Sequence, residues 1–179
     1  MAWEITTEEL LKKYTSGKRN FAGAVVIREK RYGREFIDLE GADLRDINLR
    51  GADLSFANLS GANLTGADLF AASLREARLD GAIIRNANLE CVNLFRSYLI
   101  GADLVGSNLY HANAIGAIFR EARFLYGGEH NIFIRADFRG ASIAHDAICR
   151  GMNVIWDTIM PDGSIERGPY FGEWKSISK

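Results

Sequence analysis

The amino-acid sequence predicts an all-β solenoid that forms one domain, residues 1–179. Three observations support this fold class. Leucine recurs every five residues from Leu39 onward, a period that belongs neither to the 3.6-residue helix nor to the two-residue strand. Glycine recurs every twenty residues from Gly41 to Gly101, so four five-residue units should complete one coil. The chain also holds 18 glycines but only 2 prolines and 2 cysteines, which excludes a disulfide-rich scaffold.

Eighteen consecutive units share one arrangement around a central residue. Leucine is the centre of 14 units, alanine stands two residues before the centre in 13, and Asp or Asn directly precedes the centre in 12. Since alternate residues of an extended chain face the same side, the centre and the residue two before it should both face the interior. We expect the Asp and Asn side chains to accept hydrogen bonds from nearby backbone at the corners of the coil.

The N-terminal segment, residues 5–17, predicts a helical cap on the first coil. Thr6 and Glu9 have the spacing of a capping box, and Gly17 is a helix stop signal. A short amphipathic helix from about Thr7 to Ser16 would lay its apolar side over the exposed end of the solenoid, which needs such protection.

The solenoid itself is expected over residues 19–159. Phe21 and Val26 have the spacing of two early centres, after which residues 28–35 break the five-residue period. This segment, REKRYGRE, carries six charges. We therefore expect an exposed loop between the cap and the regular units.

Two further interruptions fall in the C-terminal part. Phe124 and Phe133 are nine residues apart, so residues 127–130 predict a four-residue insertion that bulges from a corner. The period then resumes and later slips by one residue. The expected centres after the insertion are Phe133, Phe138, Ile143, Cys149, Val154 and Ile159.

Residues 160–179 predict a closing turn followed by a tail. The Pro-Asp-Gly sequence at 161–163 lies between two apolar flanks, which is a hairpin signal. The tail is too aromatic for a free linker, so we expect it to dock on the protein. Its aromatic residues are Tyr170, Phe171 and Trp174.

The repeated A-(D/N)-L-x-x motif, most regular in GADLSFANLSGANLTGADL from Gly51 to Leu69, resembles the pentapeptide-repeat family. The resemblance covers roughly residues 21–159, and the ending resembles those of cyanobacterial members. It implies a right-handed quadrilateral β-helix of square coils, with Leu or Phe at the centres and Ala beside them. A short N-terminal helix cap and a C-terminal hairpin and tail would complete this fold.

Composition excludes several classes of function. The chain has 22 Lys plus Arg against 23 Asp plus Glu, for a net charge of -1, which disfavours a nucleic-acid-binding protein. The longest apolar stretch, Phe21–Ile27, is too short to span a bilayer, so we expect no membrane partner. Two cysteines fit a reducing compartment, and we expect a cytoplasmic location.

The sequence predicts no catalytic, cofactor-binding or metal site. The acidic residues that precede the centres are dispersed from coil to coil rather than convergent. Cys91 and His111 are twenty residues apart and should emerge from the same corner of adjacent coils, which leaves open an enzyme that uses a surface Cys–His pair. His130 and His145 are expected to be isolated loop or cap residues.

The leading hypothesis for function is a non-enzymatic protein-binding or scaffolding module whose flat faces contact an unknown protein partner or a second copy. The family resemblance implies an alternative, because some members inhibit or protect DNA gyrase by imitating the shape and charge of DNA. Such mimicry needs a strong negative field. Residues 37–126 carry 11 acids and 8 Arg without an acidic stripe, which disfavours this alternative.

One corner of the solenoid predicts an interaction patch. Outward residues at this corner are polar in the early coils and become apolar in two later ones, and Arg139 with Ser142 should restore polarity in the coil that follows. Apolar patches of a few hundred Å² usually mark interaction sites. Either a protein partner, a homodimer contact or the chain's own aromatic tail could cover this one. The expected patch residues are Phe95, Tyr98, Ile100, Ile115 and Ile118.

Overall fold

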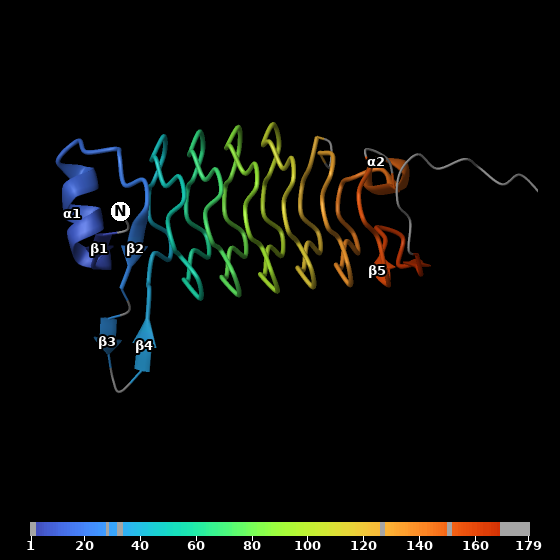
Figure 1. Cartoon of the computed structure of the whole chain (residues 1–179), viewed down its shortest axis with the longest axis horizontal. Coiled ribbons are helices and arrows are strands. Elements are labelled where there is room, and N and C mark those ends of the chain that lie inside the picture. Colours follow the sequence, from blue (N-terminus) through green and yellow to red (C-terminus); the bar gives the residue numbers. More distant parts are fainter. Residues whose placement is uncertain (1–2, 28, 32–33, 126–127, 150–151, 169–179) are drawn as a thin grey trace, which may run out of the picture.

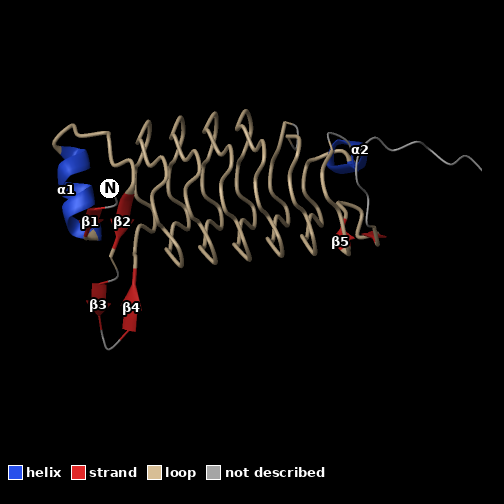
Figure 2. Cartoon of the chain, in the orientation of Figure 1, coloured by secondary structure: helices blue, strands red, loops and turns tan. Residues whose placement is uncertain are grey.

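The protein is a stack of coils between an N-terminal and a C-terminal cap (Figure 1). The structure is a computed structural model, and it describes residues 3–27, 29–31, 34–125, 128–149 and 152–168. Most of the stack carries no extended strand (Figure 2), because each five-residue unit contributes a single parallel bridge to the unit above it. Among the described residues, no helix is long and apolar enough to cross a membrane.

The N-terminal cap contains a helix and a strand pair. Strand β1 (Trp3–Ile5) runs parallel to β2 (Ala24–Val26), and helix α1 (Thr7–Thr15) follows β1. The predicted capping box is present, since the Thr6 hydroxyl accepts from the Glu9 N–H at 3.1 Å and the Glu9 carboxylate accepts from the Thr6 N–H.

Helix α1 is fixed to the first coil by its apolar side. Leu10 and Tyr14 are buried, and the Tyr14 hydroxyl donates to the Arg45 carbonyl at 2.8 Å. The helix therefore covers apolar surface that the first coil would otherwise expose to water.

The first coil contains both predicted early centres. The Phe21 N–H donates to the Asn48 carbonyl at 2.7 Å, and the Val26 N–H donates to the Asp53 carbonyl at 3.1 Å. These bonds place Phe21 and Val26 directly below the centres of the next coil, and both side chains are buried.

The segment expected to be a loop, residues 28–35, contains a β-hairpin. Strands β3 (Glu29–Arg31) and β4 (Arg34–Phe36) pair antiparallel and project away from the coils (Figure 1). The prediction failed because a run of charged residues was taken as unstructured. Backbone pairing between two short strands satisfies amide groups regardless of side-chain charge.

The regular units have the predicted inside and outside. All eighteen centres from Leu39 to Phe124 are buried, with at most 8% exposure. Each of the twelve Asp and Asn residues that precede a centre accepts a hydrogen bond from the backbone N–H two residues later. These residues are therefore corner-forming elements, as the sequence predicted.

Successive coils stack at the predicted twenty-residue interval up to residue 123. Asp38 bridges Asn58, which in turn bridges Arg78, and Asp103 bridges Arg123, all in parallel. The Leu39 N–H donates to the Asn58 carbonyl at 2.8 Å, and the same bond recurs from unit to unit. Hydrogen bonds between coils thus run along the whole stack.

The predicted four-residue insertion at 127–130 is wrong, because this coil is one residue short. Bridges join Asn113 to Ile132 and Ile118 to Asp137, intervals of 19 residues where an insertion would require 24. Buried Gly128 stands where a centre would be, and a Cβ on it would come within 3.4 Å of the Leu109 Cβ.

A polar network fills the interior beside the short unit. Asn131 is fully buried, accepts from the Ala112 N–H at 2.8 Å, and donates its own N–H to the Asn153 side chain at 2.8 Å. Asn153 in turn donates to the Ile148 carbonyl at 2.9 Å. These bonds satisfy polar groups that burial would otherwise penalise.

The expected centres of the last coil are one residue off. Val154 and Ile159 are partly exposed, whereas the following residues, Ile155 and Met160, are fully buried. Cys149 is not a centre but the last residue of helix α2 (His145–Cys149), which interrupts the units. A helical turn uses residues at a different rate from an extended unit, so a period of five cannot be carried through it.

The closing hairpin is present. Strand β5 (Thr158–Ile159) pairs antiparallel with β6 (Ile165–Glu166), and the Gly163 N–H donates to the Met160 carbonyl across the turn. The aromatic tail residues Tyr170, Phe171 and Trp174 lie outside the described residues.

Candidate interaction surface

The five predicted patch residues lie at one corner of two adjacent coils. Tyr98 and Ile118 form a parallel bridge, and the Arg96 N–H donates to the Ile115 carbonyl at 2.9 Å, which aligns Phe95 with Ile115. Tyr98 is 43% exposed and Ile100 is 39% exposed. The other three side chains are partly exposed. We call this set, Phe95, Tyr98, Ile100, Ile115 and Ile118, the apolar corner.

Arg139 and Ser142 do not follow the apolar corner in the next coil. Ser142 bridges Arg123, and the Glu121 N–H donates to the Arg139 carbonyl, so both residues belong to the neighbouring corner. The error follows from the short coil. Counting an insertion where none exists moved the assignment by five residues, one full unit.

The residue that follows Ile115 at this corner is Ile134. The Gly116 N–H donates to the Ile134 carbonyl at 2.8 Å, and the Arg135 N–H donates to the Trp156 carbonyl at 2.7 Å. Phe95, Ile115, Ile134 and Trp156 therefore form one column over four coils. Trp156 is 46% exposed.

A second pair of apolar residues lies beside this column. Ile132 and Val154 bridge each other in the same units as Ile134 and Trp156, and both are partly exposed. We call the four residues Ile132, Ile134, Val154 and Trp156 the C-terminal extension of the apolar corner. Sequence reasoning missed them, and stacking by 19 rather than 24 residues would have found them.

An ion-pair group bounds the apolar corner on one side. Asp137 follows Ile118 in its column and lies 2.6 Å from Arg120 and 2.7 Å from Arg139. Burial raises the pKa of Asp137, but the hydrogen bonds from Arg139 and Arg120 outweigh burial and lower its pKa from 3.8 to about 2. Its negative charge is thus held and neutralised at the edge of the apolar surface.

Arginine side chains also lie against the aromatic part of the corner. The Arg75 and Arg96 guanidinium groups are 4.7 and 5.0 Å from the centre of the Phe95 ring. Among the residues that the structure describes, no carboxylate is within salt-bridge distance of Arg96 or Arg135. The corner therefore combines apolar surface with two positive charges that no described acid balances.

Cys91 and His111 occupy the same corner of adjacent coils, as predicted. The Cys91 N–H donates to the Tyr110 carbonyl, and both residues are exposed at positive φ angles of 59° and 58°. His130 is not isolated, since its ring stacks on that of His111 with centroids 4.9 Å apart. A cleft of about 430 Å³ lies elsewhere, and its lining is Val25, Val26, Ile27, Ile37, Asp53, Ser55 and Phe56.

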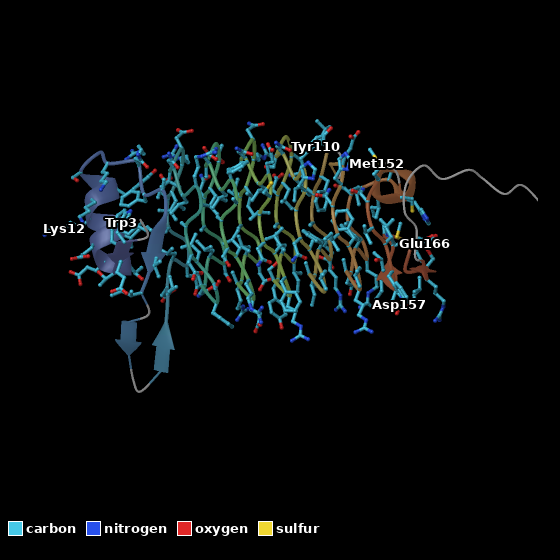
Figure 3. The ribbon with its side chains drawn as sticks, in the orientation of Figure 1. Trp3, Lys12, Tyr110, Met152, Asp157 and Glu166 are labelled. Atoms are coloured by element: carbon cyan, nitrogen blue, oxygen red, sulfur yellow. The ribbon has the colours of Figure 1, made fainter. Side chains whose placement is uncertain are left out.

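His145 is also not isolated, which corrects the expectation from sequence. Its Nε2 lies 2.9 Å from a carboxylate oxygen of Glu166, and the ligand atoms of His145, Cys149 and Glu166 are all within 4.8 Å of one another. Figure 3 shows Glu166 at the C-terminal end of the stack, close to α2. These three residues could hold a metal ion.

The family model for pentapeptide repeats matches residues 36–69, 62–97 and 87–124, in 8 copies. A pentapeptide repeat protein from Nostoc Pcc 7120 is 34% identical over 63% of this chain and 95% of its own, with a TM-score of 0.33. One from the Arabidopsis thaliana thylakoid lumen is 35% identical over 58% of this chain, with a TM-score of 0.29. The match spans 63% of the length of that Arabidopsis protein.

More distant similarity extends to QnrB1, a plasmid-mediated fluoroquinolone resistance protein. It is 18% identical over 71% of this chain and 73% of its own, with a TM-score of 0.31. Among proteins with curated descriptions, none matches the chain.

Proposed function

Because this chain belongs to the pentapeptide-repeat family, we propose that it is a non-enzymatic module that binds a partner protein through the apolar corner and its C-terminal extension. In this proposal the coil stack is the right-handed quadrilateral β-helix that the family resemblance implies, and it serves as a rigid scaffold. The observation that carries the proposal is the change in one column, from Ser55 and Arg75 to Phe95, Ile115 and the residues above them.

The composition of the surface supports binding to protein. Binding hot spots are enriched in Trp, Tyr and Arg, and Trp156, Tyr98 and Arg96 gather here. Hydrogen bonds between coils hold the backbone on which these side chains stand. A surface that is ordered before binding loses little conformational freedom on binding, so a small contact area can still give useful affinity.

The size and charge of the surface favour a segment of another protein over a second copy. Four coils at about 4.8 Å spacing span roughly 15–19 Å, which gives a few hundred Å² of apolar surface. A stable interface buries about 800 Å² per partner, so this surface alone is small for a homodimer. Arg96 and Arg135 would attract carboxylates. We therefore assign the partner as an apolar segment flanked by acidic residues.

Substitution of Ile118 by Asp tests the proposal. Peptides selected from a displayed library against the full chain should be apolar with acidic flanks, and their affinity by fluorescence anisotropy should fall at least about tenfold in Ile118→Asp. Val105→Asp is the matched control, because Val105 is a partly exposed apolar residue on another face of the coil. The melting temperature should change little in either variant.

Three outcomes would contradict the assignment. Equal loss of affinity in Ile118→Asp and Val105→Asp would show that the corner is not the binding surface. A dimer by analytical ultracentrifugation that Ile118→Asp dissociates would identify a second copy as the occupant. Binding that occurs only after removal of residues 169–179 would identify the chain's own tail as the occupant.

The two alternative functions receive less support from the described residues. Acidic side chains in the coils are largely paired with arginine, as Asp68 is with Arg50 and Asp103 is with both Arg85 and Arg123. Paired charges give little of the negative field that DNA mimicry needs. The Cys–His pair stands on a convex corner away from the cleft, where a substrate would not be enclosed.

A further inference from the structure

We propose that His145, Cys149 and Glu166 bind a divalent transition-metal ion of the zinc type, which ties helix α2 to the closing hairpin. This site is separate from the apolar corner and does not rest on the proposed function. It would act as a structural clamp on the C-terminal cap.

The fold brings the three ligands together from two elements. His145 and Cys149 are four residues apart on α2, so their side chains lie on the same helical face. Glu166 is the last residue of β6, and the β5–β6 pairing fixes its position. The His145 Nε2 and the Glu166 carboxylate are already 2.9 Å apart, and all three ligand atoms are within 4.8 Å of one another.

These separations are close to what a metal ion requires. Zinc binds sulfur at about 2.3 Å and nitrogen or oxygen at about 2.0–2.2 Å, so tetrahedral ligand atoms are roughly 3.3–3.8 Å apart. Side-chain rotation of about 1 Å would bring Cys149 into that range without backbone movement. The arrangement therefore needs no rearrangement of α2 or of the hairpin.

The ligand types select the class of metal. Thiolate and imidazole favour zinc, cobalt and related ions over magnesium and calcium, which prefer oxygen ligands. Three protein ligands leave a fourth position for water. Cys149 is buried, whereas the His145 side chain is 39% exposed, so the site has a protected side and an open side through which an ion can enter.

A nearby carboxylate adds to the attraction for a cation. Asp162 lies in the turn between β5 and β6 and interacts with His145. Hydrogen bonds from Ser164 are the main reason that the pKa of Asp162 lies below its usual value, and His145 contributes a smaller lowering. Both Asp162 and Glu166 therefore place negative charge near the proposed ion.

The position of the site explains what an ion would do. Helix α2 has five residues and β5 has two, and elements this short have little stability of their own. Both lie at the end of the stack, where the last coil would otherwise be open (Figure 1). A metal bond across these two elements would hold the cap closed, in the way that structural zinc sites stabilise small folds.

Titration of the full chain with metal tests the proposal. After removal of bound metal by chelation, Zn²⁺ should bind with one-to-one stoichiometry by calorimetry, and Co²⁺ should give the thiolate-to-metal absorption band of a tetrahedral site. A hundredfold excess of Zn²⁺ over its dissociation constant should raise the melting temperature by about 5–10 °C.

Variants of the three ligands locate the site. Cys149→Ser should abolish the cobalt–thiolate band and weaken Zn²⁺ binding by about 100-fold, and His145→Gln and Glu166→Gln should weaken it by about 10- to 100-fold. Cys91→Ser and His111→Gln are matched controls that remove the same chemical groups elsewhere, and they should bind as the parent does.

The proposal fails if Zn²⁺ produces no saturable heat, or if the cobalt band survives Cys149→Ser or disappears in Cys91→Ser. Because Cys149 is buried, its substitution could impair folding, so His145→Gln and Glu166→Gln provide an independent test on more exposed residues. Unchanged affinity in both would also overturn the site. Ile118→Asp should leave Zn²⁺ binding intact, which separates this proposal from the one on partner binding.

Discussion

Replacing Gly128 by alanine tests the one-residue-short coil directly. Gly128 has a φ of 74°, and a Cβ on it would lie 3.2 Å from the Leu109 carbonyl carbon and 3.0 Å from the Asn131 amide nitrogen. A side chain in the left-handed region costs about 1–2 kcal/mol. Crowding against a packed backbone adds about 1–3 kcal/mol. Gly128→Ala should therefore lower the free energy of unfolding by about 2–5 kcal/mol.

Gly81→Ala is the matched control for this experiment. Gly81 has a φ of 65°, but no heavy atom lies within 4 Å of the position that its Cβ would take. Ala71 already adopts a φ of 54° at such a corner. The control should therefore lose only the conformational term, about 1–2 kcal/mol. Urea unfolding followed by circular dichroism measures both variants. Equal losses would mean that Gly128 is not packed on Leu109 and that the 19-residue coil is wrong.

Three further predictions concern stability. Leu89→Asp should abolish the cooperative thermal transition, because it places a charge in the fully buried column of centres; a normal transition would refute the burial of that column. Thr6→Ala should lower the free energy of unfolding by about 1 kcal/mol through loss of the capping box, provided that α1 unfolds with the coils. Asp137 has a pKa of about 2 in the folded chain and about 3.9 when unfolded, so its ion pairs stabilise the fold above pH 4 and lose that effect as pH falls toward 2. Because both arginine partners are half exposed, we expect about 1–2 kcal/mol, measured as a difference between the parent and Asp137→Asn that is present at pH 7 and absent at pH 2.

The local features of the fold could be predicted from sequence because each unit is defined by its own five residues. A buried centre such as Leu89 and a corner aspartate such as Asp53 need only their immediate neighbours to take their roles. The capping box of α1 is equally local, since Thr6 and Glu9 bond to each other. Their outcomes were therefore independent of how the coils stack.

Features that depend on distant contacts could not be predicted in the same way. The charged segment 28–35 shows no alternation of apolar and polar residues, so its hairpin had no sequence signal. His145 and Glu166 are 21 residues apart and meet only because α2 and the closing hairpin share one end of the stack. The sequence showed each of them, but it contained no indication that they lie together.

A five-residue period determines which side chains face inward but not the face of the solenoid on which an outward residue lies. An error of five residues leaves every centre a centre, so it is invisible to the repeat itself. It nevertheless moves each outward residue to the next face, as it did for Arg139 and Ser142 in place of Ile134 and Asp137. Only the length of each coil, 20 residues early and 19 at Gly128, fixes the faces. The interaction surface of a solenoid is therefore determined by its irregular units, and in this chain those units align the column from Phe95 to Trp156.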